Sequence, residues 1–300
     1  MIEPKSLHNN YKISIVGSGK VARALANAFS KTGIILTDII CRFPINTADT
    51  SETSFFENAF DLEKDFTIEG IYFLAVSDDA IQEVAQKIVN KKNTGDVFLV
   101  HCSGASDLTV LANKNSSLKG IASFHPIQTI QHGADLSIFS NVGISILSEN
   151  SDLEKTLFQI AKLIGAKPFK VNPKQKQLLH LAAVFASNYF NTLIHQLHKF
   201  DTALGLKDAH IIDILKPIIS QTADVIIGNG THSTLTGPIS RGDSETIRNH
   251  LKLLEELPHQ LTELYILMGQ LASDQALEAN QIDENHYSKL ISALKNDQEE

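Results

Sequence analysis

The feature that most constrains the fold is a glycine-rich turn near the N-terminus. The apolar run Lys12–Val16 is followed at once by the spacing G-x-G-x-x-A, formed by Gly17, Gly19 and Ala22. A helical pattern, Val21–Lys31, comes next. This arrangement is typical of a dinucleotide-binding α/β unit, because the first glycine permits a tight turn, the second lets a pyrophosphate approach the backbone, and the alanine lets the helix pack against the sheet.

The rest of the N-terminal half alternates apolar runs with helical patterns. We expect further strands at Thr37–Arg42, Gly70–Val76, Val97–Cys102, Gly120–Phe124 and Val142–Leu147. Alternation at this spacing predicts a doubly wound, parallel, Rossmann-type sheet with helices on both faces. Strand signals nearly vanish after about residue 172. The sequence therefore predicts an α/β domain over residues 1–172 and an all-helical domain over residues 173–300.

Composition narrows the classes of function. The net charge of −8 disfavours binding to the nucleic-acid backbone, and no apolar run is long enough to span a membrane. The two cysteines, Cys41 and Cys102, cannot make a disulfide framework, and neither has a second thiol or a histidine at zinc-ligand spacing. The N-terminus lacks the apolar core of a signal peptide. We expect a cytoplasmic protein without a metal site.

The end of the second expected strand bears on the choice of cofactor. An NAD site usually has a carboxylate here, about 20 residues beyond the glycines, that binds the ribose 2′-hydroxyl. This chain instead has Arg42, whose guanidinium can pair with a 2′-phosphate. The sequence thus favours NADP over NAD, although a solvent-facing arginine is the alternative. The residues predicted to bind the cofactor are Gly17, Ser18, Gly19, Lys20, Val21, Arg42, Val76, Ser77 and Ser103.

Polar residues also follow the later strands, where open α/β sheets bind their ligands. Ser77 follows the strand that ends near Val76, and Ser103 follows the next one, on the nicotinamide side of the expected cleft. His125 precedes a proline, which holds it in an extended conformation and could aim it at substrate. A structural loop histidine is the alternative for His125.

A polar stripe marks the first long helical pattern of the second half. At about 100° per residue, His180, Ser187 and Asn191 fall on one face, and Asn188 lies about 80° away. Polar groups on an otherwise apolar helix are either hydrogen-bonded between packed helices or functional. We interpret the stripe as the wall of a substrate pocket.

A second polar segment lies between later helical patterns. It runs from Thr236 through Arg241 to Asp243, and contains a Gly–Pro turn. Asp243 or Ser244 is expected to cap the helix that follows. Capping leaves Thr236 and Arg241 unexplained, so we predict that they bind a polar or anionic part of the substrate.

Taken together, these segments resemble a known family. The chain is similar, over about residues 11–270, to Rossmann-like oxidoreductases with a C-terminal helical domain of uncharacterised function, relatives of pyrroline-5-carboxylate reductase and of the deazaflavin-dependent NADP oxidoreductases. The resemblance implies NADP, a helical domain that forms a dimer, and an active site between the domains. The segments that carry it are GSGKVA, AVSDDAI, HCSGA, FHPIQT, HLAAVFASNY and LTGPISRGD.

The chain departs from the wider hydroxyacid dehydrogenase pattern at one point. That pattern has a lysine and an asparagine one turn apart on the interdomain helix, whereas this chain has Lys176 and His180 at that spacing. We therefore expect His180, rather than the lysine, to be the proton donor.

The sequence thus predicts an NADP-dependent oxidoreductase that transfers hydride to or from a small carbonyl or imine carbon. His180 would act as general acid or base, and Ser187 and Asn188 would orient the substrate. Thr236 or Arg241 would hold the polar tail of the substrate. A catalytically silent NADP(H) sensor that acts as a dimer is the alternative, and a scaffold with an empty site is a third possibility. Neither a Ser-His-Asp order nor paired carboxylates support a hydrolase.

Overall fold

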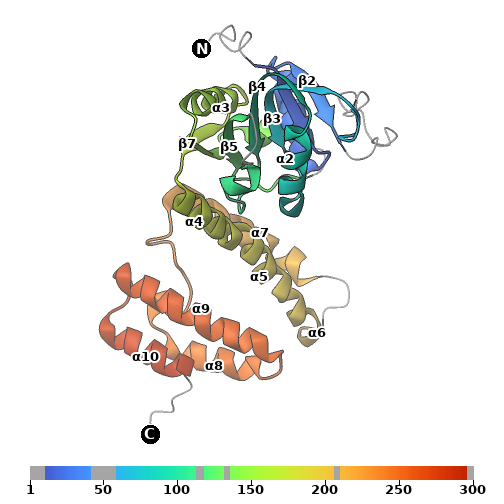
Figure 1. The fold of residues 1–300 in the computed structure, drawn as a ribbon. Helices are drawn as coiled ribbons and strands as arrows, with labels where there is room; N and C mark the ends of the chain where they lie inside the picture. The colour runs from blue at the N-terminus through green and yellow to red at the C-terminus, as the bar shows by residue number, and fades with distance from the viewer. Residues whose placement is uncertain (1–10, 42–58, 113–117, 132–135, 206–209, 296–300) are drawn as a thin grey trace. The chain divides into compact units, whose positions relative to one another are not determined.

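The computed structural model describes residues 11–41, 59–112, 118–131, 136–205 and 210–295 (Figure 1). The chain divides into two compact units, Met1–Ser187 and Asn188–Glu300. The helix α4 (Pro173–Ala183) falls in the first unit with the sheet.

A seven-stranded sheet organises the first unit. Its strands lie in the order β2-β1-β3-β4-β5-β6-β7, so the chain passes from β1 to a neighbour on one side and then returns to the other side. The strands are β1 (Ile13–Val16), β2 (Leu36–Ile40), β3 (Thr67–Leu74), β4 (Lys92–His101), β5 (Leu118–Pro126), β6 (Gly143–Ser148) and β7 (Lys167–Lys170).

The strand directions differ in one place from the all-parallel prediction. β6 runs antiparallel to β5, whereas the other neighbouring pairs are parallel. The described part of the connection between β5 and β6 contains a 3-10 turn, η6 (Leu136–Phe139), rather than a crossover α-helix. An antiparallel neighbour needs only a reversal of the chain, which such a connection can make. The sequence also gave no signal for β7, a short strand of which two of the four residues are lysine.

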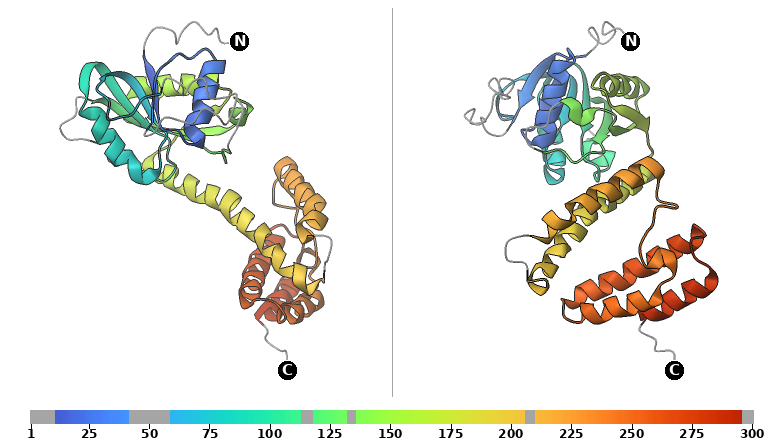
Figure 2. Two further views of the ribbon diagram at one scale, coloured as in Figure 1. Left: turned by 90° about the vertical axis from the view of Figure 1, so that its right-hand side faces the viewer. Right: turned by 180° about the vertical axis from the view of Figure 1, so that it is seen from behind.

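Helices cover both faces of this sheet (Figures 1 and 2). On one face, α1 (Lys20–Lys31) and α3 (Ser151–Leu163) bury apolar side chains such as Phe29 and Leu157 against the sheet. On the other face, α2 (Ile81–Val89), which follows the 3-10 turn η4 (Asp78–Ala80), packs with η5 (Leu108–Leu111). The predicted doubly wound Rossmann-type fold is therefore confirmed.

All described secondary structure of the second unit is helical, as predicted. A buried cluster that includes Ile247, Ala276 and Leu290 joins its last three helices. No described helix is both long and apolar enough to cross a membrane. The helices are α5 (Phe190–Gln196), η8 (Leu197–Lys199), α6 (Phe200–Ala203), α7 (Ile211–Asn229), η9 (Ile239–Arg241), α8 (Ser244–Leu254), α9 (His259–Glu278) and α10 (Glu284–Lys295).

Candidate functional site

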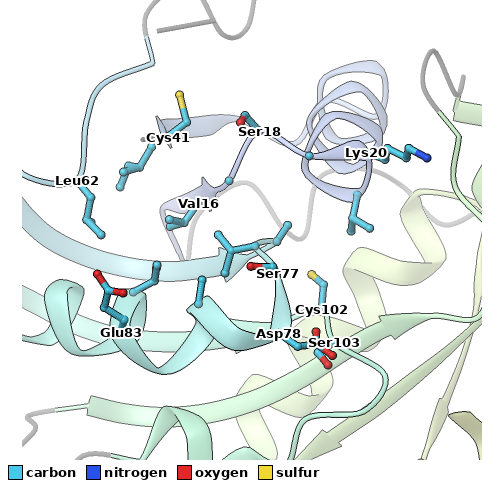
Figure 3. A pocket seen from close by; sticks show the side chains of 18 of the residues that line it. Val16, Ser18, Lys20, Cys41, Leu62, Ser77, Asp78, Glu83, Cys102 and Ser103 are labelled. Atoms are coloured by element: carbon cyan, nitrogen blue, oxygen red, sulfur yellow. The ribbon is translucent and has the colours of Figure 1, made fainter. Parts of the chain in front are cut away.

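The first unit has a cavity of about 1200 Å³ at the carboxyl ends of its central strands. It lies where β1 separates β2 from β3, which is the topological switch point at which open α/β sheets bind ligands. Figure 3 shows lining side chains, among them Ser18, Ser77 and Ser103, on the loops that follow β1, β3 and β4. The lining residues that the sequence singled out are Gly17, Ser18, Gly19, Lys20, Val21, Val76, Ser77, Ser103, His125 and His180.

The two glycines of the first loop have different surroundings. Gly17 has φ of +127°, and a Cβ atom there would lie 2.3 Å from the carbonyl oxygen of Ala75. Its N–H donates to the carbonyl of Ile40 at 2.8 Å, so the turn is held between the neighbouring strands. Gly19 has an ordinary extended backbone, and a Cβ atom there would meet nothing within 4 Å. The open space beside Gly19 is what close approach of a ligand requires.

The loop leads directly into α1, whose first N–H groups have no partner within the helix itself. Gly19 is the N-cap and offers no side chain to accept a hydrogen bond, and the first turn contains no acidic residue. A bare helix N-terminus at the edge of a cavity favours an anion, because its N–H groups and the helix dipole both attract negative charge. The pocket therefore fits the pyrophosphate of a dinucleotide. Arg42, on which the choice of NADP depends, lies outside the described residues.

A buried lysine fixes the loop after β4. Lys176, on α4, is 2% exposed, and its Nζ donates to the carbonyls of Ser103, Gly104 and Ser106 at 2.9, 2.8 and 2.7 Å. Burial lowers the pKa of Lys176 to about 8. Within the residues that the structure describes, no carboxylate forms an ion pair with this ammonium group. The lysine therefore ties α4 to the wall of the cavity through backbone carbonyls alone.

Two histidines face the same short segment of that wall. The ring centroids of His125 and His180 are 6.1 Å apart, and a Cβ atom on Gly104 would lie within 2.7 Å of both rings. A side chain at position 104 would force the rings to shift, so glycine lets both rings lie against the loop. Burial lowers the pKa of His125 to about 4, and the charge of Lys176 adds to the effect. His125 is therefore neutral near pH 7 and can bind a substrate as a hydrogen-bonding group, but it carries no proton to give as an imidazolium.

A further histidine lies wholly inside the sheet unit. His101, the last residue of β4, is fully buried, and neither ring nitrogen has a hydrogen-bond partner among the described residues. Burial lowers its pKa to about 3, with Lys176 contributing. Burial also raises the pKa of the adjacent Cys102 thiol to about 12, so this thiol is not a nucleophile at neutral pH.

The helical stripe requires a correction. The placement of Ser187 and Asn191 assumed a uniform α-helix, but α4 ends at Ala183 and a π-helical segment, η7 (Val184–Tyr189), follows. A π-helix has more residues per turn, so a constant rotation of 100° per residue is wrong beyond Ala183. The hydroxyl of Ser187 lies 3.0 Å from that of Thr129, within the first unit.

The other predicted substrate residues belong to the second unit. They are Asn188, Thr236 and Arg241, and their roles stay predictions. Arg241 ends η9 and lines a separate, shallow hollow of about 580 Å³ with Asp283, Glu284 and His286. The predicted cap of α8 is confirmed, because Asp243 accepts a hydrogen bond from the N–H of Thr246 at 3.0 Å.

The environments of Lys176, Gly104 and His101 were not predicted from the sequence. Lys176 stands among glutamines and another lysine in the first turns of α4, a composition typical of a solvated helix end. The only signal for it is its spacing of four residues from His180. In the sequence, Gly104 and His101 look like ordinary residues of a turn and a strand end. Their neighbours in the sequence do not indicate which groups surround them in the fold.

The fold and this pocket define the chain as a Rossmann-type protein with a dinucleotide-sized cavity and a helical C-terminal region. Residues 143–272 match the family model described as a domain of unknown function, DUF2520. No curated protein sequence matches the chain.

Solved structures show the same fold. BF3122 from Bacteroides fragilis, described as a candidate NADP oxidoreductase, is 22% identical with a TM-score of 0.70, over 88% of this chain and 98% of that one. Protein TM1727 from Thermotoga maritima is 25% identical with a TM-score of 0.67, over the same shares of the two chains. A 1-pyrroline-5-carboxylate reductase from Streptococcus pyogenes is 13% identical with a TM-score of 0.51, over 94% and 98%. These matches show the fold that the strand and helix patterns predicted, and the match to the domain of unknown function agrees with the family resemblance noted from the sequence.

Proposed function

We propose that the chain is an NADP-dependent oxidoreductase that transfers hydride between the nicotinamide and a small carbonyl or imine substrate. The observation that carries the proposal is the glycine turn at the switch point, where Gly19 leaves open space beside the bare N-terminus of α1. The names of the similar proteins support it, since one is a candidate NADP oxidoreductase and another reduces 1-pyrroline-5-carboxylate, a cyclic imine. The bound nicotinamide would supply or accept the hydride.

The protein's own part is to hold the substrate and to move a proton. His180 lines the cavity, and it would give a proton to the carbonyl oxygen or imine nitrogen as the carbon receives hydride. The neutral His125 would bind the same oxygen or nitrogen. Ser187 and Asn188 would orient the substrate, and Thr236 or Arg241 would hold its polar tail; these four roles rest on the sequence pattern. We also propose a cytoplasmic location, which rests on the composition and the two cysteines of the sequence.

A titration with NADPH and NADH, followed by nicotinamide fluorescence, tests the cofactor. We expect tighter binding of NADPH, and we expect Arg42→Ala to lower the NADPH affinity by roughly 10-fold or more while sparing NADH, because one charge-assisted pair to a phosphate is lost. Arg248→Ala, an exposed arginine of α8, is the matched control. Equal binding of both cofactors, unchanged in Arg42→Ala, would contradict the NADP assignment, and no binding of either would contradict the proposed function.

A panel of small carbonyl and imine compounds then separates the two functions. An enzyme oxidises NADPH with at least one of them, and His180→Ala slows that reaction. A protein that binds NADPH tightly and turns over none of them is instead the NADP(H) sensor, whose oligomeric state or partner affinity changes with the cofactor. Full activity in His180→Ala would remove His180 from the proposed mechanism.

We also propose that the chain forms a homodimer through its helical part. Large apolar side chains stand exposed at helical spacing on α4 and η7, namely Leu178, Leu181 and Phe185, and on α7, namely Ile214 and Ile218. Large apolar side chains exposed along a helix are typical of a surface that contacts another protein. Sedimentation equilibrium should give about twice 32.9 kDa. Ile218→Glu should shift the mass toward one chain, whereas Ile35→Glu, an exposed isoleucine of the sheet unit, should not; a monomeric wild type would contradict the proposal.

A further inference from the structure

The second unit brings three metal-type ligands together at one helix junction. His198 lies in η8, Asp201 lies one turn further along in α6, and His210 is the N-cap of α7. The chain leaves one helix and enters the next between Asp201 and His210, so residues from both sides of the junction meet. No part of the proposed oxidoreductase function uses them.

The ligand atoms lie close enough to share one ion. Nδ1 of His198 is 3.2 Å from Oδ2 of Asp201, and Nδ1 of His210 is 3.6 Å from the same oxygen. All three ligand atoms lie within 4.8 Å of one another. Two ligands of a tetrahedral zinc ion, each about 2.0–2.1 Å from the metal, are about 3.3 Å apart. The two separations from Oδ2 of Asp201 are therefore near those of a formed site, and side-chain rotations would bring the two histidine nitrogens, which lie within 4.8 Å of each other, close enough to share the ion.

The backbone holds the carboxylate in this orientation. The N–H of Ile211 donates to Oδ1 of Asp201 at 2.8 Å, which leaves Oδ2 directed at the two histidines. The orientation of the carboxylate therefore comes from the backbone and does not depend on a bound ion. A hydrogen bond to the other carboxylate oxygen is a common way for proteins to orient a metal ligand.

Other histidine–carboxylate pairs of the chain lack this convergence. His286 of α10 pairs with Asp283, the residue just before that helix, and His259 pairs with Glu263 within α9, so each pair joins one histidine to one carboxylate. Within the described residues, the group at the α6–α7 junction is the only one in which three such ligands come together. A further histidine, His195, lies one turn before His198, with its ring centroid 5.6 Å from that of His198.

We propose that His198, Asp201 and His210 bind a divalent transition-metal ion, with zinc as the best fit, and that the ion ties the end of α6 to the start of α7. Two imidazoles and one carboxylate form a ligand set that zinc prefers. The fourth position of the tetrahedron is left to water or to His195. Both histidines would bind through Nδ1, the nitrogen that faces Asp201.

The proposal is tested by zinc binding to tag-free, chelator-treated protein, measured by calorimetry and by the visible absorption of Co²⁺ as a spectroscopic substitute. We expect one ion per chain, a tetrahedral Co²⁺ spectrum and a higher unfolding temperature with zinc, because the metal binds the folded site. His198→Ala should weaken binding by about 100-fold or more, since a direct ligand matters at least as much as an outer partner.

Two further variants make the test specific. Asp201→Asn keeps an acceptor for the N–H of Ile211 but removes the charged ligand, so it should lose zinc while the junction still folds. His259→Ala removes a histidine that also pairs with a carboxylate, and it should bind zinc as the wild type does. Wild-type protein that binds no zinc, or His198→Ala and Asp201→Asn that bind it unchanged, would overturn the proposal.

Discussion

Gly17→Ala is expected to destabilise the sheet unit by about 2–6 kcal/mol and to abolish dinucleotide binding. The new Cβ atom would lie 2.3 Å from the carbonyl oxygen of Ala75, on the backbone that leaves β3, and the residue would have to keep φ of +127°. Strain at such a φ costs about 1–3 kcal/mol, and overpacking against a rigid neighbour costs a similar amount. The backbone of the adjacent loop cannot move aside, since the N–H of Ala75 is bonded to the carbonyl of Val16 at 2.8 Å.

Gly19→Ala is the matched variant, and it should behave in the opposite way. Its Cβ atom would meet nothing within 4 Å and the backbone is extended, so the fold should be unharmed or slightly more stable. That same Cβ atom would enter the space that a pyrophosphate needs, so NADPH affinity should fall. Chemical denaturation and the fluorescence titration measure the two effects separately. A Gly17→Ala protein as stable as the wild type, or a Gly19→Ala protein that binds NADPH fully, would contradict this division of roles.

The parts of the fold that the sequence predicted are those encoded locally. The turn through Gly17 and Gly19, the buried strands and the amphipathic helices each have a period or a spacing that a short segment reveals. Strand direction has no such local signature, which is why the antiparallel β6 was not predicted. The four residues of β7 are too few, and too polar, to show a period at all.

The same contrast between local and long-range features applies to the residues of the candidate site. Residues on the loops after the strands were found, because the carboxyl ends of parallel strands meet at one edge of a sheet. The burial of Lys176 was not found, because it depends on three carbonyls that lie 70 to 73 residues earlier in the chain. The shift in helical register at η7 was also hidden, since no residue of Val184–Tyr189 is a helix breaker.

Lys176→Met is the second change with a large expected effect. It keeps an unbranched apolar side chain of nearly the same length but leaves the carbonyls of Ser103, Gly104 and Ser106 without their donor. A buried polar group that loses its partner costs about 1–3 kcal/mol, so we expect the free energy of unfolding to fall by about 3 kcal/mol or more. Lys176→Gln retains two N–H donors, so its free energy of unfolding should lie between that of Lys176→Met and that of the wild type. Lys174→Met, an exposed lysine one half-turn earlier, should change stability by less than about 0.5 kcal/mol.

A second readout distinguishes the charge of Lys176 from its hydrogen bonds. Burial, then the nearby ammonium group, holds the pKa of His125 down to about 4. Removing that ammonium in Lys176→Met leaves only burial and His180 to oppose protonation, so the pKa of His125 should rise toward its ordinary value, as followed by NMR titration of the imidazole. His125 would then take up a proton at a higher pH than in the wild type, and any activity that needs it neutral would be lost earlier as pH falls. An unchanged pKa of His125, together with unchanged stability, would show that Lys176 holds neither the loop nor the charge state of the site.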